Sequence, residues 1–400
     1  MRRAALSLRR ATAAAVHSPL LAAAGRPRAA ATATAAAATA MASAANGVTP
    51  PERERTRRAL LEDVARGRPR LVPPRVRVRG ADDGGDAAAD EALGRRGLRR
   101  ERLLVQSEEG SAQGWVPLNV VAPLAAPAAG GRRPALLLLH CTGSRKEHFD
   151  ERMAAAAEAG YVAAAFDARY HGERAISGHG TPRDGYQAAL IAAWRGSGER
   201  PFLLDNVHDG RHVLDALAAR PDVDASRIGV AGVSLGGMHS WLLAACDERV
   251  AAAAPAIGVQ GFAWAVRHAQ FAGRVESVPR LFEAAAADLG APEVDAAVVE
   301  AVWRKMLPGL MEAYDSPRSL ACIAPRPLLI LNGELDPRCP IPGLTEAVDA
   351  ARPVYEAAGA GAALGLSIHA GVGHEETPAM AAEARAWLDA QLLRPGDAWK

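Results

Sequence analysis

From residue 103 onwards, short continuous apolar runs alternate with longer segments that have helical periodicity. Strands that are buried on both faces of a sheet are apolar without alternation, so each run predicts such a strand. The six runs are Pro134–His140, Tyr161–Asp167, Arg227–Val233, Val250–Ile257, Pro327–Asn332 and Leu364–His369. Helices are expected between them, at 149–159, 205–219 and 235–246. This repeated pattern predicts an α/β fold with a mostly parallel, doubly wound sheet and helices on both faces.

Two more strands are expected before the first parallel one, at Leu103–Gln106 and Trp115–Val121. The Gly-containing turn between them, Glu109–Gly114, is too short for a crossover connection. Parallel strands need such a crossover, so this edge of the sheet is predicted to be antiparallel.

Residues 51–102 are predicted to form an N-terminal extension to a main domain at 103–400. A short helix is expected at Arg57–Ala65. Val72–Val78 alternates like a strand, but its two prolines restrict it to an edge position. Ala81–Asp90 is Gly-rich and acidic, which predicts a flexible loop.

Residues 258–324 interrupt the alternation, because they contain no strand signal. Apolar residues recur there at helical spacing in three segments, Phe262–Ala272, Pro279–Asp288 and Val294–Tyr314. In a doubly wound sheet, ligands bind at the carboxyl edge of the strands. We therefore interpret this stretch as a helical cap inserted over that edge, with ordinary helical packing as the alternative.

The N-terminal 50 residues have a composition typical of a targeting segment. They contain 21 Ala and six Arg but no acidic residue. Arg-rich, acid-free leaders are typical of transit peptides, which predicts import into a chloroplast or mitochondrion. A low-complexity tail without targeting function is the alternative. Initiation at Met41 would remove the leader and give a cytosolic form.

The remainder of the chain is acidic although the whole chain has a net charge of +2. Residues 103–400 hold 26 basic and 35 acidic residues, which disfavours a nucleic-acid partner. The Ala/Thr run at 29–40 is too weakly apolar for a bilayer span, and no other candidate span is present. Neither a nucleic-acid partner nor a membrane span is therefore expected, while the oligomeric state stays open.

The pentapeptide Gly232-Val233-Ser234-Leu235-Gly236 follows an apolar strand and opens a helix. The motif G-x-S-x-G requires this context, because its Ser lies on a sharp strand-to-helix turn. Glycine at the two outer positions removes Cβ atoms that would collide in such a turn. Ser234 is therefore the predicted nucleophile.

A serine hydroxyl needs a base to take its proton, and the base needs an orienting carboxylate. His374 lies in a loop between the last predicted strand and the C-terminal helix, so it is the predicted base, with His369 as its rival. Asp336 follows the strand Pro327–Asn332 and is the predicted carboxylate, with Glu334 as the alternative.

An oxyanion hole needs two N–H donors. Leu235 is one expected donor, and Thr142 is the other, with Cys141 as the fallback. The bulky residues of the insertion that are expected to line an acyl pocket are Phe262, Trp264, Phe271 and Trp303. No metal site is predicted, since the four cysteines lie far apart and Asp167, His171 and His179 lack a well-spaced further ligand.

Residues 103–400 resemble the α/β-hydrolase superfamily, and within it the branch of prolyl oligopeptidases, acetyl xylan esterases and dienelactone hydrolases. The resemblance is carried by three motifs: Arg220–Asp224 leading to Arg227–Val230, the serine turn, and Phe166–Glu173. It implies a Ser–Asp–His hydrolase of esters, lactones, thioesters or amides without a cofactor. The chain departs from the family at His140-Cys141, where members often have His-Gly. With its leader, it resembles a plant organellar protein.

Dienelactone hydrolases use a cysteine nucleophile, whereas this chain has Ser234. Oligopeptidases carry a large N-terminal propeller, and only about 50 residues stand between leader and hydrolase here. The expected function is therefore that of a carboxylesterase-like serine hydrolase acting on a small ester or lactone. A serine peptidase or acyl-aminoacyl hydrolase is one alternative, and a non-catalytic small-molecule receptor is the other.

Overall fold

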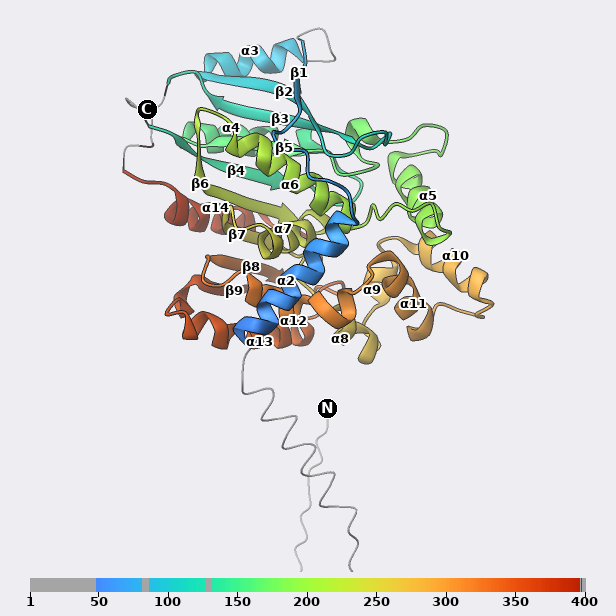
Figure 1. Cartoon of the computed structure of the whole chain (residues 1–400). Helices are drawn as coiled ribbons and strands as arrows, with labels where there is room; N and C mark the ends of the chain where they lie inside the picture. The colour runs from blue at the N-terminus through green and yellow to red at the C-terminus, as the bar shows by residue number, and fades with distance from the viewer. Residues whose placement is uncertain (1–47, 81–85, 127–130, 396, 398–400) are drawn as a thin grey trace, which may run out of the picture. The chain divides into compact units, whose positions relative to one another are not determined.

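A nine-stranded sheet forms the centre of this computed structural model, which describes residues 48–80, 86–126, 131–395 and 397 (Figure 1). Its strands are β1 (Val76–Val78), β2 (Leu98–Gln106), β3 (Trp115–Pro123), β4 (Arg133–Leu139), β5 (Val162–Phe166), β6 (Val223–Val233), β7 (Val250–Ala256), β8 (Leu328–Gly333) and β9 (Leu364–His369). They lie in the order β1-β2-β3-β5-β4-β6-β7-β8-β9. The strands from β5 to β9 in that order pair in parallel, while β1, β2 and β3 are antiparallel to their neighbours. Both the parallel sheet and its antiparallel edge are as predicted.

Each face of the sheet carries its own buried core, because successive side chains of a strand point to opposite faces. Leu137 and Leu139 of β4 belong to a core shared with α6 (Leu204–Ala218), α7 (Leu235–Cys246) and α13 (Ile341–Ala357). Leu136 and Leu138 belong to the other core, shared with α4 (Asp150–Glu158) and α14 (Pro378–Leu392). The doubly wound arrangement is confirmed.

The N-terminal extension packs onto the same compact unit as the sheet. The helix α2 (Pro50–Ala65) buries Leu60 and Val64 completely in the first core. Downstream of it, the Arg68 guanidinium pairs with Asp205 at 2.9 Å, at the start of α6. The described part of the extension therefore contributes two helices, α2 and α3 (Ala87–Arg95), the strand β1 and the start of β2 to the body of the fold.

Two helices were not expected from the sequence. Part of the predicted loop Ala81–Asp90 is instead the first turn of α3 (Ala87–Arg95), while 81–85 lie outside the described residues. The Asp86 carboxylate caps α3 by accepting the Ala89 N–H at 3.1 Å, which satisfies an otherwise free donor. The other unexpected helix, α5 (Pro182–Trp194), begins with the Thr181 hydroxyl as its N-cap.

The stretch 258–324 contains helices and no strand, as the pattern predicts. Its longer helices are α8 (Phe262–Arg267), α9 (Ala272–Val275), α10 (Pro279–Leu289) and α11 (Ala296–Met306). They lie together with α5 beyond one end of the central strands (Figure 1). The predicted helix Phe262–Ala272 is split into α8 and α9, because Ala269 between them has a φ of +51°. The last predicted segment, Val294–Tyr314, is interrupted: α11 ends at Met306, and a short helical turn at Leu310–Tyr314 follows Pro308 and the left-handed Gly309.

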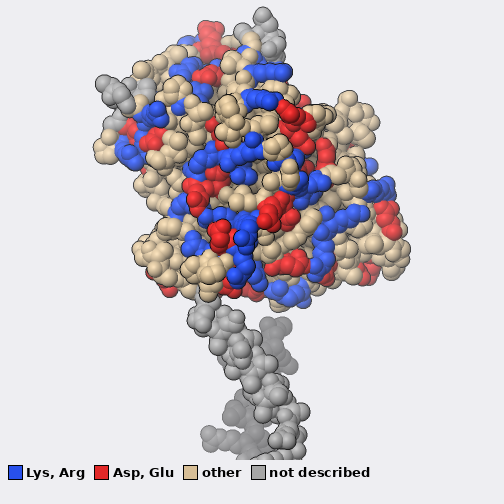
Figure 2. All heavy atoms as spheres, viewed as in Figure 1, with Lys and Arg blue, Asp and Glu red and all other residues tan. Residues whose placement is uncertain are grey.

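Basic and acidic side chains are interspersed over the surface seen in Figure 2. Within the ranges that the structure describes, no helix combines the length and apolarity needed to cross a membrane.

Candidate active site

Ser234 occupies a sharp turn between β6 and α7, with a φ of 54° and a ψ of −109°. A residue with a side chain adopts this region only under strain. The flanking glycines permit the turn: a Cβ at Gly232 would lie 2.3 Å from the Gly236 oxygen, and one at Gly236 would lie 2.0 Å from the Leu139 oxygen. The Ser234 N–H donates to the Ala256 oxygen at 2.9 Å, which fixes the turn against β7.

Ser234, His374 and Asp336 are joined by hydrogen bonds. The Oγ of Ser234 lies 2.7 Å from Nε2 of His374. The other ring nitrogen, Nδ1, lies 2.9 and 2.8 Å from the two carboxylate oxygens of Asp336. Asp336 also accepts the backbone N–H groups of Arg338 at 2.8 Å and Cys339 at 3.2 Å. In this arrangement a carboxylate orients an imidazole that is able to take the proton of a serine hydroxyl.

The two alternative residues make other contacts. Glu334 is exposed, and its carboxylate accepts the Gly371 N–H at 2.8 Å. His369 lies with Nε2 3.0 Å from the Glu383 carboxylate of α14. The structure therefore brings His374 and Asp336, and neither alternative, to Ser234.

The surroundings set the charge states of His374 and Asp336. Burial lowers the pKa of His374; its hydrogen bond to Asp336 opposes this, and the positive charges of Arg274 and Arg338 add to it. Burial by itself raises the pKa of Asp336, but the contact with His374 and the two backbone donors hold the pKa below its ordinary value. Near pH 7 the imidazole is therefore neutral and the carboxylate ionised, as general-base activation needs.

We expect kcat/KM for an ester to stay level from neutral pH to below about 6.5, the ordinary histidine pKa, and to fall only at lower pH. Protonated His374 cannot accept the Ser234 proton, and a lowered pKa keeps the ring neutral further into the acid range. The measurement is a pH–rate profile, with circular dichroism at each pH to exclude unfolding. An inflection above the ordinary value in a folded enzyme would contradict this assignment.

The two loops expected to supply the oxyanion hole lie beside Ser234. Leu235 is the first residue of α7, so its N–H belongs to the helix N-terminus behind the nucleophile. The loop that begins at His140 follows β4, whose Leu139 pairs in register with Gly232 of β6. Thr142 and Cys141 are both half-buried in that loop. Burial raises the pKa of the Cys141 thiol, which disfavours its use as a nucleophile.

The four aromatic residues of the insertion are placed mainly as packing residues. Trp303 is fully buried, and its ring lies 5.3 Å from that of Phe262, with Phe202 and Phe282 at similar distances. Trp264 stacks on His268 and covers Gly343 of α13. Phe271 is half-buried against the first core. The geometry favours a role for Phe262 and Trp303 in holding the insertion onto the body of the fold.

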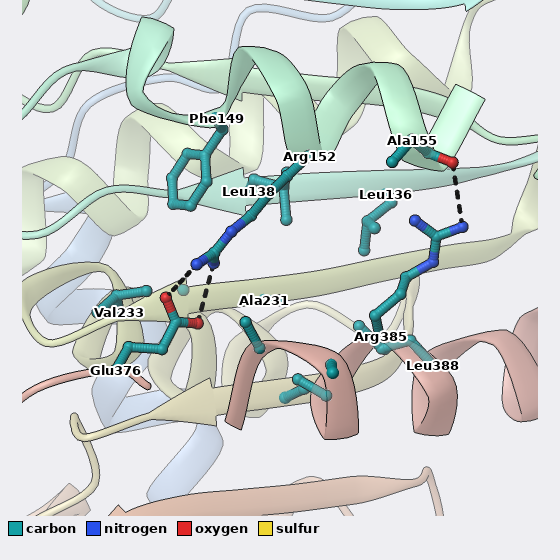
Figure 3. A pocket seen from close by; sticks show the side chains of 15 residues that line it. Leu136, Leu138, Phe149, Arg152, Ala155, Ala231, Val233, Glu376, Arg385 and Leu388 are labelled. Atoms are coloured by element: carbon teal, nitrogen blue, oxygen red, sulfur yellow. Dashed lines mark hydrogen bonds and ion pairs between the residues drawn. The ribbon is translucent and has the colours of Figure 1, made fainter. Parts of the chain in front are cut away.

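A bidentate ion pair that the sequence did not suggest holds the His374 loop. Both guanidinium nitrogens Nη1 and Nη2 of Arg152, on α4, bind the Glu376 carboxylate, at 2.9 and 2.6 Å. The pair stands at one end of a cavity of about 240 Å³ between α4, α14 and the sheet (Figure 3). Val233, which precedes Ser234, lines the same cavity, as does Glu376, which lies two residues after His374. The ion pair therefore restrains the His374 loop from the side of α4, beside the packing of Val372 against the second core.

We expect Arg152→Glu to lower kcat for an ester about tenfold or more with a small change in KM, because even a small misplacement of a catalytic base is costly. Glu376→Arg should have a similar effect, since each single change sets like charges against each other. The double exchange Arg152→Glu/Glu376→Arg should recover most of the activity. Failure of the double variant to recover, with its melting temperature unchanged, would contradict this positioning role.

One group of side chains within the described ranges brings three possible metal ligands together, namely Asp336, Cys339 and His374, with ligand atoms within 4.8 Å of one another. Burial raises the pKa of the Cys339 thiol to about 12, so it stays protonated. Metal binding requires the thiolate. Nδ1 of His374 is also already engaged by Asp336. The group is therefore better suited to hydrogen bonding than to holding an ion.

Comparison with known proteins gives a family and a set of similar folds. A model described as the alpha/beta hydrolase family matches residues 136–390. The chain is similar in structure to acetyl xylan esterase 1 from Thermoanaerobacterium sp. JW/SL YS485, with a TM-score of 0.59 and 16% identity over 87% of this chain and 96% of that chain. It is also similar to methylesterase BT1017, with a TM-score of 0.54 and 17% identity over 84% and 62% of the two chains. A sequence search of curated proteins gives no match. Since the family model covers more than half of its length, this chain belongs to the α/β-hydrolase family.

Proposed function

We propose that this protein is a serine hydrolase that cleaves carboxylic esters of small molecules. The observation that carries the proposal is the hydrogen-bonded series Ser234–His374–Asp336 on a strained turn at the carboxyl edge of a parallel sheet. Strain at a buried serine that contacts a neutral imidazole has no evident structural benefit, and it is what nucleophilic catalysis uses.

In the proposed reaction, His374 takes the proton of Ser234 as Oγ attacks the ester carbonyl carbon. Asp336 stabilises the imidazolium, and the N–H of Leu235 with one from Thr142 or Cys141 stabilises the oxyanion. His374 then gives the proton to the leaving alcohol, which leaves an acyl group on Ser234. A water molecule, deprotonated by His374, attacks this acyl-enzyme, and the acid departs as Ser234 regains its proton.

The similar structures support an ester as substrate over an amide. Two of them are named as acetyl xylan esterases and one as a methylesterase. Because the sequence identities are low, these names support ester hydrolysis only as an activity that the fold carries elsewhere. The proposal therefore includes lactones and thioesters as substrates. A serine peptidase or acyl-aminoacyl hydrolase is the second candidate, and a non-catalytic receptor the third.

The deciding experiment is a turnover screen with p-nitrophenyl esters of graded chain length, beside lactones and aminoacyl p-nitroanilides. Ester or lactone turnover well above the anilides would support the proposal. Turnover of anilides alone would favour the peptidase. A fluorophosphonate probe that fails to label the folded protein, together with no turnover of any substrate, would favour the receptor.

We also propose that residues 1–50 direct the protein to a chloroplast or mitochondrion; residues 1–47 lie outside the described part of the chain. A fluorescent protein fused to residues 1–50 is expected to enter one of these organelles, because the leader is rich in Arg and free of acids. Deleting residues 1–40 should abolish import and leave ester hydrolysis unchanged. A fusion that stays diffuse in the cytosol would contradict targeting.

A further inference from the structure

Arg274 is a buried arginine beside the candidate active site that lacks an acidic partner. It is 4% exposed. Its Nε donates to the Gln260 side chain at 3.2 Å, and its Nη2 donates to the Arg338 carbonyl at 3.2 Å. Within the described ranges, no Asp or Glu lies at ion-pair distance from it, and the negative charge of Asp336 acts on it from farther away. Burial of a charge is costly unless it is paired, so a missing partner needs an explanation.

The position of Arg274 links it to the reacting groups. Its Nη2 lies 3.6 Å from the sulfur of Cys339, and that sulfur lies within 4.8 Å of a nitrogen of His374 and an oxygen of Asp336. The backbone next to it also approaches closely, since a Cβ at Gly273 would lie 2.6 Å from the Pro337 oxygen. The helix α9 of the insertion thus places one unpaired positive charge a single side chain away from the base.

An unsatisfied donor lies nearby on α5. The hydroxyl of Tyr186 is completely buried and has no hydrogen-bond partner within the described ranges. Arg183, one turn earlier, donates to the Ser277 carbonyl at 3.0 Å, which ties α5 to the segment that follows α9. Burial raises the pKa of Tyr186, and the guanidinium of Arg274 is near enough to act against that rise. A cation without an acidic ion-pair partner and a phenol hydroxyl without an acceptor therefore stand on α9 and α5.

We propose that Arg274 and Tyr186 bind a carboxylate of the substrate, so that the enzyme prefers esters that carry a free acid group. The guanidinium and the phenol supply donors of the kind that a carboxylate accepts, and the anion would neutralise the buried charge. This inference rests on the proposed esterase function and narrows its substrate class. The acid can belong to the acyl part, as in a half-ester of a dicarboxylic acid, or to the leaving group.

The first test compares two esters that differ only in the terminal group, p-nitrophenyl hydrogen glutarate and p-nitrophenyl valerate. The wild-type enzyme should prefer the glutarate. Arg274→Met should lower kcat/KM for the glutarate at least about 30-fold more than it lowers the valerate value, because only the glutarate loses the partner of its buried charge. A second pair, 4-acetoxybenzoate and 4-acetoxytoluene, moves the acid to the leaving group and identifies which side of the ester the arginine binds.

Two variants separate binding from packing. Arg267→Met removes an exposed arginine of the same insertion, which pairs with Glu346, and should leave the preference unchanged. Tyr186→Phe removes a hydroxyl that has no partner, so its melting temperature should not fall, while its kcat/KM for the glutarate should drop about tenfold. A merely structural tyrosine would show no such kinetic effect.

The outcomes also separate this inference from the proposed function. If valerate and glutarate are hydrolysed equally, and Arg274→Met leaves their ratio unchanged, the carboxylate site is wrong while the esterase stands. If neither ester is hydrolysed, the esterase proposal fails, and calorimetry with free glutarate decides the site alone. Glutarate binding that Arg274→Met abolishes would support it, and an absence of binding to the wild-type protein would overturn it.

Discussion

Replacing Ser234 by alanine is expected to lower kcat/KM for a reactive ester at least about 10⁴-fold, because in the proposed mechanism the Ser234 oxygen forms the bond to the acyl group. The fold should persist. Alanine is smaller than serine, the backbone N–H that fixes the turn is retained, and the lost hydrogen bond joins only Ser234 and His374. The measurement is steady-state hydrolysis by both proteins, with thermal unfolding to compare their stability.

Ser240→Ala is the matched control, since it makes the same substitution in the helix α7 that begins directly after Ser234. Ser240 is buried and donates its hydroxyl to the Gly236 carbonyl at 2.7 Å, so this variant loses one local hydrogen bond and no reacting group. Its kcat/KM should stay within a few fold of wild type. Retained turnover in Ser234→Ala that disappears in Cys141→Ala would transfer the nucleophile role to the cysteine.

The sheet could be predicted because its strands are defined locally. Runs such as Pro134–His140 and Tyr161–Asp167 are apolar on both faces, and only a strand covered by helices on both sides buries them. The two unexpected helices have weaker local signals. The helix α3 begins inside an acidic Gly-rich stretch, and α5 follows a run with Gly178 and Gly180, both of which adopt positive φ. Tertiary contacts, such as the burial of Tyr186, stabilise α5.

Some residues of the site are likewise indicated by local sequence, whereas others depend on contacts between distant parts of the chain. Ser234 was identifiable because its glycines, its strand and its helix are all neighbours in the chain. The choice of Asp336 over Glu334 depends on which carboxylate faces a ring 38 residues later, and chain order alone leaves both within reach. Arg152 and Glu376 are 224 residues apart. Arg274 is of interest because it is buried without an acidic partner. Such features exist only in the folded chain, so no local pattern could have indicated them.

His374→Ala is expected to lower kcat/KM about as much as Ser234→Ala, because the Ser234 hydroxyl is a weak nucleophile when no base takes its proton. The double variant Ser234→Ala/His374→Ala should therefore be no slower than either single variant. His369→Ala tests the specificity of this effect. His369 lies five residues earlier in the same segment, and its ring contacts Glu383 on α14 instead of Ser234. Losing that half-buried contact should lower stability by about 1 kcal/mol or less and change kcat/KM only a few fold.

The comparison is made at a single pH near 8, where the lowered pKa of His374 keeps its imidazole neutral in the wild-type enzyme. Hydrolysis by each variant is measured after its thermal unfolding has shown that it is folded. If the double variant were much slower than either single one, His374 and Ser234 would act independently, and the shared mechanism would be wrong. If His369→Ala were inactive while His374→Ala kept its turnover, the proton would have to leave Ser234 by a different route. The 2.7 Å contact between Ser234 and His374 would then be a feature of the resting enzyme alone.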